Sequence, residues 1–250
     1  MRKKKYLEKK KGIKKGRVLG LFAVILLLIL VILGLFYKYS SNLNFSFVRK
    51  TSGGGGEILI IDSINNKTSK ISLDPDLELD SARGYGKYKL SSLWVLGEKE
   101  RINGKLVSES INKNYFTPIY LWDDGKNSNL NIFQKFALLM KLRNVETVQL
   151  TSLEILSPLL FGLNETTDIK VEMDDLTGNS NTSVAVSKIL SNLSLKVQNY
   201  SRGYDENLDC EVKTENEKLG QFISNLFECK FDRSGETFLI RIGGVFDKRF

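Results

Sequence analysis

Histidine is absent from this 250-residue chain, and cysteine occurs only twice. The absence of histidine excludes Ser-His-Asp and Cys-His catalysis, histidine general bases and histidine-ligated metals. Two cysteines are too few for a structural zinc site or for a cysteine-ligated iron–sulfur cluster. We therefore predict no metal-binding residues and no resident cofactor.

The net charge of +8 comes from one short segment. Residues 1–17 hold ten basic residues and a single acid, Glu8, which leaves 27 basic and 28 acidic residues in the rest of the chain. A nucleic-acid-binding domain instead carries its positive charge on the folded surface that contacts the phosphates. We therefore predict no nucleic-acid partner, and we interpret residues 1–17 as a basic cytoplasmic tail that attracts anionic lipid headgroups.

Residues 18–37 contain no charged side chain. Twenty residues of helix span about 30 Å, which matches the hydrocarbon core of a bilayer. A secretory signal peptide is the alternative, but its apolar region is usually about 7–15 residues long and ends at a small-residue cleavage site. We predict a retained transmembrane helix in contact with the lipid bilayer. Because the basic tail precedes it, we expect a single-pass cell-membrane protein with a cytoplasmic N-terminus and an extracytoplasmic body.

Residues 38–56 are predicted to be a Gly/Ser linker, ending in four glycines that form a flexible spacer or a backbone turn. A phosphate-binding glycine loop would be followed by a helix with Lys-Ser or Lys-Thr, whereas residues 57–64 are typical of a strand. Residues 65–68 predict a turn, and residues 69–73 a second strand of a hairpin. The rest of a mixed α/β domain over residues 57–163 comprises helices at 90–96, 106–111 and 132–142 and strands at 118–122 and 145–150.

The second half, residues 168–250, follows a polar boundary at 164–168. Its patterns predict a small βαββαβ unit, and the fold class is mixed α+β. The expected elements are strands at 169–173, 195–197, 210–212 and 238–242, helices at 182–193 and 216–227, and a polar turn at 174–181.

This second half resembles the LytR C-terminal domain. Residues 169–178 (I-K-V-E-M-D-D-L-T-G) are similar to the family's opening strand, V-x-V-x-N-G-T-G, with Asp174 at the usual asparagine. Residues 183–185 (S-V-A) begin the helix, and residues 240–246 (I-R-I-G-G-V-F) are similar to the closing strand.

The first half resembles a shortened LytR-CpsA-Psr domain, the usual neighbour of that module. The similar segments are residues 61–70 (I-D-S-I-N-N-K-T-S-K), 84–97 (G-Y-G-K-Y-K-L-S-S-L-W-V-L-G) and 116–122 (F-T-P-I-Y-L-W). The resemblance implies a family that transfers glycopolymers from undecaprenyl pyrophosphate to the cell wall, with arginines and an aspartate-bound magnesium at the pyrophosphate.

The residues that handle pyrophosphate in this family are largely missing here. Residues 71–76 (I-S-L-D-P-D) stand where S-I-P-R-D is usual, and Gly55-Gly56-Glu57 replaces an Arg-x-Asp. Acids without an arginine clamp repel a pyrophosphate. We therefore predict a catalytically degenerate cell-envelope protein. It would bind or position a cell-wall polymer or polyprenyl-linked glycan, or pair with an envelope protein partner.

The alternative is an active phosphotransferase of this type with a rebuilt site, in which Glu57, Arg83 and Lys89 act with Mg²⁺. Under the non-catalytic interpretation, Arg83, Lys87 and Lys89 beside the G-Y-G segment could contact an anionic polymer, or could simply form a solvated strand edge. A transcriptional regulator is excluded by the predicted topology, which places the folded domains outside the cytoplasm.

Two further sets of residues carry predictions. Cys210 and Cys229 are expected to form a disulfide, since the predicted compartment is oxidising; two separately buried thiols are the alternative. The acid pairs 123–124 and 174–175 could bind a cation, but each lies beside Gly and Asn. Aspartate is favoured at such positions because it bonds to the turn backbone, and we interpret both pairs as turns.

Overall fold

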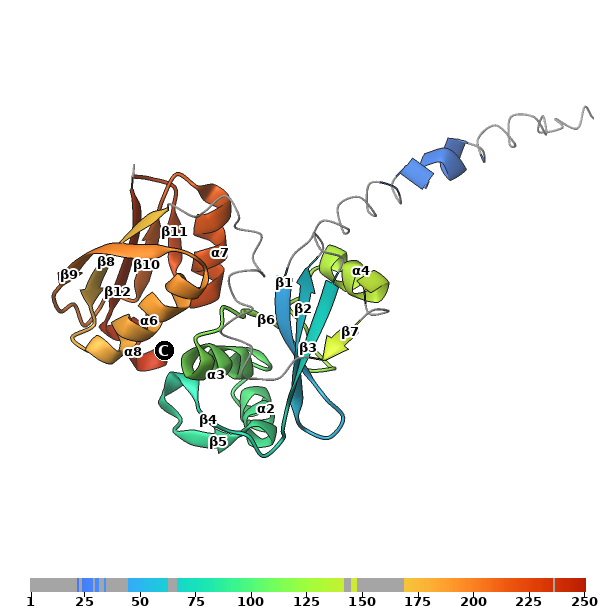
Figure 1. The fold of residues 1–250 in the computed structure, drawn as a ribbon, viewed down its shortest axis with the longest axis horizontal. Helices are drawn as coiled ribbons and strands as arrows, with labels where there is room; N and C mark the ends of the chain where they lie inside the picture. Colours follow the sequence, from blue (N-terminus) through green and yellow to red (C-terminus); the bar gives the residue numbers. More distant parts are fainter. Residues whose placement is uncertain are drawn as a thin grey trace, which may run out of the picture. The chain divides into compact units, whose positions relative to one another are not determined.

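The computed structural model describes residues 22, 24–28, 30, 31, 34, 45–62, 67–141, 145–147, 169–235 and 237–250 (Figure 1). The predicted tail 1–17, most of the predicted span 18–37 and the whole predicted boundary 164–168 lie outside these residues. Among the described residues, no helix combines the length and the apolar content needed to cross a membrane. The chain divides into the units Met1–Asn42 and Leu43–Phe250, and the second unit contains both predicted domains.

The first sheet has the strand order β6-β1-β2-β3-β7. Its strands are β1 (Phe45–Lys50), β2 (Gly56–Asp62), β3 (Lys67–Leu73), β6 (Leu121–Asp123) and β7 (Val145–Thr147). β2 pairs antiparallel with both β1 and β3, which confirms the predicted hairpin. The assignment of residues 38–56 to a linker is wrong for residues 45–50, because β1 is part of the sheet.

The glycine run forms the turn that joins β1 to β2. The backbone N–H of Thr51 donates to the carbonyl of Gly55 at 3.1 Å, and Gly54 has a φ of 80°. A Cβ on Gly55 would lie 2.6 Å from the carbonyl oxygen of Leu73, so only glycine fits there. Trp94 Nε1 donates to the same Gly55 carbonyl at 3.2 Å. The backbone-turn alternative is therefore confirmed for residues 51–55.

Both faces of the first sheet are covered, because successive side chains of a strand point to opposite faces. On β2, Ile58 and Ile60 pack with helices α2 (Leu90–Lys99) and α3 (Lys105–Tyr115). Leu59 and Ile61 pack on the other side with helix α4 (Ile132–Lys141). The result is a three-layer arrangement, visible in Figure 1, and it confirms the three predicted helices.

A short hairpin precedes α2. It consists of β4 (Glu78–Asp80), the 3₁₀ turn η1 (Ala82–Gly84) and β5 (Lys87–Lys89). The sequence predicts no hairpin here, but the solvated strand edge given as an alternative for Arg83, Lys87 and Lys89 is confirmed for the two lysines, which are exposed on β5. Each of the two strands has only three residues, which is too short for a recognisable alternation of polar and apolar side chains.

The second sheet has the order β11-β10-β12-β8-β9. Its elements in chain order are β8 (Lys170–Leu176), α6 (Ser180–Asn192), β9 (Lys196–Arg202), β10 (Cys210–Lys213), α7 (Glu217–Phe227), β11 (Lys230–Asp232), β12 (Phe238–Gly243) and α8 (Gly244–Arg249). The predicted order of strands and helices is present, with β11 and α8 in addition. Mixed α+β is therefore the observed fold class.

The described residues on either side of positions 148–168 form two lobes: a first lobe, residues 45–147, and a second lobe, residues 169–250. The second lobe has two layers, because α6 and α7 pack into one core on one face of its sheet. On β8, Val171 and Met173 are buried in this core, while Glu172 and Asp174 between them face the other side.

The two lobes share packing contacts. Phe116 and Tyr120 of the first lobe pack against the core of the second lobe. The Tyr120 ring meets the ring of Phe222 edge-on, with centroids 5.4 Å apart. Asn192 Nδ2 at the end of α6 donates to the Phe116 carbonyl at 2.8 Å. These contacts explain why the two predicted domains lie in a single compact unit.

Candidate functional site: a groove between helix α6 and strand β9

The predicted site residues of the first lobe each contact a different partner. Glu57 on β2 lies directly opposite Arg49 on β1, and Arg49 Nε donates to Glu57 Oε1 at 2.5 Å. The Glu57 side chain is only 12% exposed. Its carboxylate is therefore held by a neighbouring strand of its own sheet.

Arg83 lies where the two lobes meet. Its Nε and Nη2 donate to the two carboxylate oxygens of Glu109 on α3, both at 2.8 Å, and Nη2 also donates to Glu228 of the second lobe at 2.9 Å. The hydrogen bond with Glu109 is the largest influence on the pKa of Arg83 and raises it, although burial acts in the opposite direction. A two-pronged arginine–carboxylate pair is among the stronger polar contacts in proteins. Arg83 thus joins the lobes.

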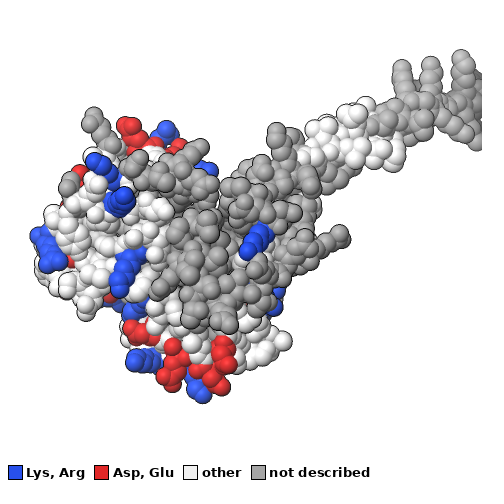
Figure 2. Space-filling view, in the orientation of Figure 1, with Lys and Arg blue, Asp and Glu red and all other residues white. Residues whose placement is uncertain are grey.

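Lys87 and Lys89 are exposed on β5, facing acids of β4. Asp80 lies opposite Lys87 in the ladder, and Lys89 Nζ donates to Asp76 at 2.9 Å. Figure 2 shows acidic and basic side chains mixed over this hairpin. The charge of Lys89 is thus balanced by Asp76, whereas the carboxylate of Asp80 forms its ion pair with Lys113 at 3.1 Å.

The predicted disulfide between Cys210 and Cys229 is present. It ties β10 to the segment that follows α7, with the two Cα atoms 4.7 Å apart. Arg249 of α8 lies beside it, and its Nη2 donates to the carbonyl of Phe227 at 2.9 Å. The alternative of two separate thiols is therefore wrong.

The two acid pairs have different outcomes. Asp123 and Asp124 accept backbone N–H donors of residues 125–127, as expected of a turn. The turn assigned to Asp174 and Asp175 is wrong, because both belong to β8. Within the described ranges, no group of three or more Asp, Glu, Cys or His residues is arranged to hold a metal ion.

Helix α6 presents one stripe of side chains away from the core. Asn179 caps the helix, and its side chain accepts the backbone N–H of Asn181. Val186, Ile189 and Leu190 are then buried in the second lobe. With 3.6 residues per turn, residues spaced by three and four positions share another face. The residues of that face that line the groove are Val184, Ser187, Lys188 and Ser191.

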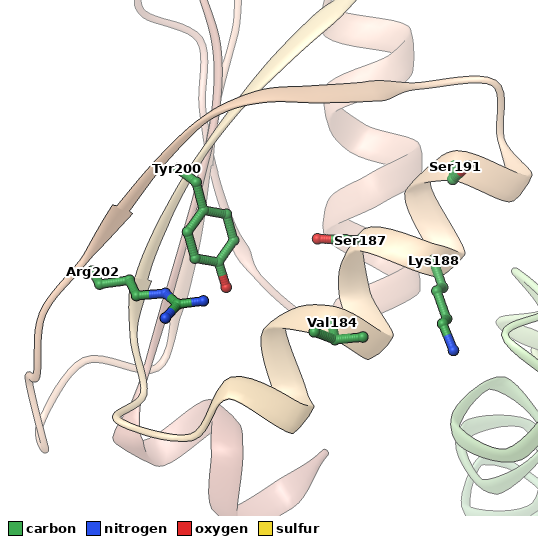
Figure 3. Close-up of a pocket in the computed structure, with 6 residues that line it drawn as sticks. All are labelled: Val184, Ser187, Lys188, Ser191, Tyr200 and Arg202. Atoms are coloured by element: carbon green, nitrogen blue, oxygen red, sulfur yellow. The ribbon is translucent and has the colours of Figure 1, made fainter.

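Strand β9 forms the opposite wall. Tyr200 and Arg202 lie two residues apart and therefore on one face of the strand, and both line the groove with the α6 stripe. The groove has a volume of about 340 Å³. Figure 3 shows both side chains extending from β9 toward α6.

A buried carboxylate holds Tyr200 in place. Asp175 on the neighbouring strand is 4% exposed, and its Oδ2 accepts the Tyr200 hydroxyl at 3.0 Å. Its Oδ1 accepts the hydroxyl of Thr177 at 2.5 Å and the Thr177 N–H at 3.1 Å. Burial alone would raise the pKa of Asp175, but hydrogen bonds from Thr177, Ser183 and Tyr200 outweigh it, so the pKa is lowered. The carboxylate is thus buried, and the hydrogen bonds that it accepts favour its ionised form.

Arg202 and Lys188 differ in orientation. The Arg202 guanidinium lies 5.2 Å from the centre of the Tyr200 ring, at the groove. Lys188 instead extends away from Tyr200, as Figure 3 shows, and its Nζ lies 4.5 Å from the centre of the Phe116 ring in the first lobe. Neither cation forms an ion pair with another described residue. The groove therefore offers an arginine, hydroxyl groups and the apolar Val184.

This groove is not among the sites that the sequence predicts. The predicted strand ends at residue 197 and a loop follows it, so Tyr200 and Arg202 are not candidates from sequence alone. The alternation in K-V-Q-N-Y-S-R is weak, because Val197 and Tyr200 are three residues apart in the sequence; a β-bulge in the β8–β9 pairing brings both to the same face, opposite Val171 and Met173. The helical stripe with Lys188 is visible in the sequence, but a stripe of this kind is usual on any exposed helix.

Comparisons with known proteins assign no family. No family model matches the chain, and no curated protein matches it. Among solved structures, the crystal structure of a transcriptional regulator from Enterococcus faecalis is 13% identical. The match has a TM-score of 0.27 and covers 76% of this chain and 90% of that one. A likeness at this level supports no statement about fold or function.

Proposed function

We propose that this protein is a membrane-anchored, extracytoplasmic cell-envelope protein that holds a binding partner without catalysing a transfer. The uncharged run at residues 18–37 and the basic tail before it support an anchor with the N-terminus in the cytoplasm. The disulfide between Cys210 and Cys229 is in keeping with an oxidising, extracytoplasmic location.

The resemblances supply the type of protein. Because of the similar sequence segments at residues 61–122 and 169–246, the first lobe would be a shortened LytR-CpsA-Psr domain and the second a LytR C-terminal domain. Both lobes mix helices with a sheet, which is compatible with these assignments. The bound partner would be a cell-wall polymer, a polyprenyl-linked glycan or another envelope protein.

One observation carries the non-catalytic role: the three residues on which a rebuilt transferase site would depend are engaged by separate protein groups. Glu57 is held by Arg49, Arg83 by Glu109 and Glu228, and Lys89 by Asp76. Catalysis on a pyrophosphate needs charged groups that converge on the transferred group. Here the charges join strands and lobes instead. The residues present therefore do not fit a magnesium–pyrophosphate centre.

The test is binding of undecaprenyl pyrophosphate to the full chain in detergent micelles, with and without Mg²⁺. We expect no saturable, Mg²⁺-dependent binding. The variants Glu57→Gln and Lys89→Gln should behave as the unmodified chain does, and Lys218→Gln on α7 serves as a matched control. Tight binding that requires Mg²⁺ and is lost in Glu57→Gln would establish the transferase alternative instead.

The anchor is tested separately. Membranes from cells that express the full chain are washed with alkaline carbonate, which removes peripheral proteins. The protein should remain in the pellet, and it should be released by the wash after deletion of residues 18–37. Release of the intact chain would contradict the proposed anchor.

A further inference from the structure

Strand β9 is an edge of the second sheet. It is the last strand in the order β11-β10-β12-β8-β9, and within the described residues it pairs only with β8. Every second residue of an edge strand directs its backbone N–H and C=O away from the sheet, where they can pair with another strand. With 7 residues, β9 offers such groups over about 20 Å.

The groove lies along this edge. One wall of the groove is the stripe of α6 side chains at Val184, Ser187, Lys188 and Ser191. The other wall is the face of β9 that carries Tyr200 and Arg202 (Figure 3). A strand placed beside β9 would direct alternate side chains toward α6, where Val184 is 50% exposed and Ser187 and Ser191 supply hydroxyls. An edge strand beside a helix-walled groove is a geometry by which extended peptides add to sheets.

The charges select the kind of segment. Helix α6 and strand β9 contain no acidic residue, and their cations are Lys188, Lys196 and Arg202. None of these cations forms an ion pair with another described residue. Asp175 is the acid of β8 on the α6 side, and its buried carboxylate is already bound by Thr177 and Tyr200. On the side that faces α6, the edge is therefore complementary to the acidic side chains of an added strand.

A second copy of this chain fits the edge less well. Pairing of β9 with another β9 would place the cations of both copies in one strand pair, where like charges are unfavourable. Lysine and arginine also protect edge strands from self-association, which accounts for the charges. That protection does not account for the groove or for the buried carboxylate that fixes Tyr200.

We propose that β9 and the groove beside α6 bind an extended acidic segment of another envelope protein, which adds to the five-stranded second sheet as a further edge strand. This inference rests on the proposed function, because it names the partner that the non-catalytic protein holds. Backbone pairing with β9 supplies the register, Arg202 pairs with a carboxylate, and the α6 stripe accepts the side chains that point inward.

The experiment uses the full chain in detergent micelles and a fluorescent, N-acetylated octapeptide of alternating Glu and Val. Two further peptides carry backbone N-methyl groups on the odd or on the even residues. Strand addition uses only one edge of the peptide. We therefore expect the unmodified peptide and one methylated form to bind, and the other methylated form to lose binding. Equal binding of both methylated forms, or no saturable binding of any peptide, would overturn the proposal.

Protein variants test the same geometry. Arg202→Gln removes an exposed charge and should weaken peptide binding by up to about fivefold, the upper end of the effect of one exposed ion pair. Lys218→Gln on α7 removes a cation away from the groove and should leave the affinity unchanged. If the two variants weaken binding equally, the peptide is held by overall charge and the assignment of the groove is wrong.

Hydrogen exchange supplies an internal control, because the sheet has a second edge strand. The bound peptide should slow exchange of backbone amides in β9 and leave those of β11 unchanged. Inorganic polyphosphate should fail to reproduce this protection; if it does reproduce it, the groove is a general anion site and the proposal is wrong. If the peptide tests fail, only the proposed strand addition is wrong, and the undecaprenyl pyrophosphate result is unaffected. Mg²⁺-dependent binding of undecaprenyl pyrophosphate would instead contradict the proposed function, regardless of the peptide results.

Discussion

Arg83 and Glu228 lie 145 residues apart in the sequence, and Nη2 of the arginine donates to Oε2 of the glutamate at 2.9 Å. Glu228 follows α7 with a φ of 56° and precedes Cys229 of the disulfide. Its carboxylate also pairs with Lys105 of the first lobe and lies 3.8 Å from Arg249 of the second. The carboxylate of Glu228 thus interacts with cationic side chains of both lobes.

The first prediction concerns this contact. Arg83→Gln removes the guanidinium that pairs with Glu109 and with Glu228. The Glu109 side chain is only 17% exposed. Loss of a charged hydrogen bond that leaves a partly buried carboxylate unpaired costs about 1–3 kcal/mol. The free energy of unfolding in urea should fall by that amount. Lys87→Gln, at an exposed lysine of β5, is the control and should change it by less than about 0.5 kcal/mol. Equal effects of the two variants would show that the lobe contact is not stabilising.

Much of the local structure can be predicted because its signals are contained in short windows of sequence. The β2–β3 hairpin and helices α2, α3, α4, α6 and α7 follow from side-chain periodicity and turn residues, and the disulfide follows from the two cysteines and the predicted oxidising compartment. Strand β1 is not predicted, because the sequence on either side of it is rich in Ser, Asn and Gly. Phe45 and Phe47 do alternate with other residues as in a strand. The glycines suggest flexibility, whereas they permit the close approach of Gly55 to Leu73.

Contacts between distant segments cannot be predicted in the same way. Nothing near Arg83 in the sequence indicates that it meets Glu228, since the pairing depends on how two lobes pack. The candidate groove has the same character, because it needs α6 and β9 to lie side by side. The turn predicted at Asp174 and Asp175 fails for a related reason: a single sequence gives no sign that Asp175 is bonded by Tyr200 from the neighbouring strand.

The second prediction concerns the disulfide, which joins cysteines 19 residues apart. Closing a loop of this size lowers the entropy of the unfolded chain and stabilises the folded state by about 3 kcal/mol. Urea unfolding with and without a phosphine reductant should show this loss. The double variant Cys210→Ser with Cys229→Ser should match the reduced protein and be insensitive to reductant. An unchanged urea midpoint after complete reduction would contradict the prediction.

The third prediction concerns Gly220 in α7. Alanine is favoured over glycine inside a helix by about 1 kcal/mol. A Cβ at this position, however, would overlap the ring of Phe231 and lie 2.8 Å from Cγ2 of Thr214. Overpacking of this kind costs about 1–3 kcal/mol, so we expect it to outweigh the gain in helix propensity. Gly220→Ala is therefore expected to lower the melting temperature, while Gln221→Ala on the exposed side of α7 should leave it nearly unchanged. A stabilised Gly220→Ala variant would show that α7 and β11 move apart easily.

The fourth prediction concerns the pH dependence that Asp175 imposes. Its pKa is lowered in the folded protein, where burial is outweighed by hydrogen bonds from Thr177, Ser183 and Tyr200. The ordinary aspartate pKa is about 3.9. A group whose folded pKa is depressed contributes stability that is present above its unfolded pKa and is lost as the pH falls through its folded pKa. The stabilisation by Asp175 should therefore be complete at neutral pH and be lost progressively as the pH falls below about 5.

Asp175→Asn isolates this contribution. At neutral pH the variant should be less stable by about 1–3 kcal/mol, because the buried amide cannot accept the same charged hydrogen bonds. The difference in the free energy of unfolding should stay constant from neutral pH down to about pH 5 and then shrink as the unmodified protein loses its carboxylate. Tyr200→Phe removes one donor, so it should raise the pKa of Asp175 toward its ordinary value in a carbon-13 NMR titration. A stability difference that grows on acidification would mean that Asp175 is protonated in the folded protein and that Tyr200 is held in another way.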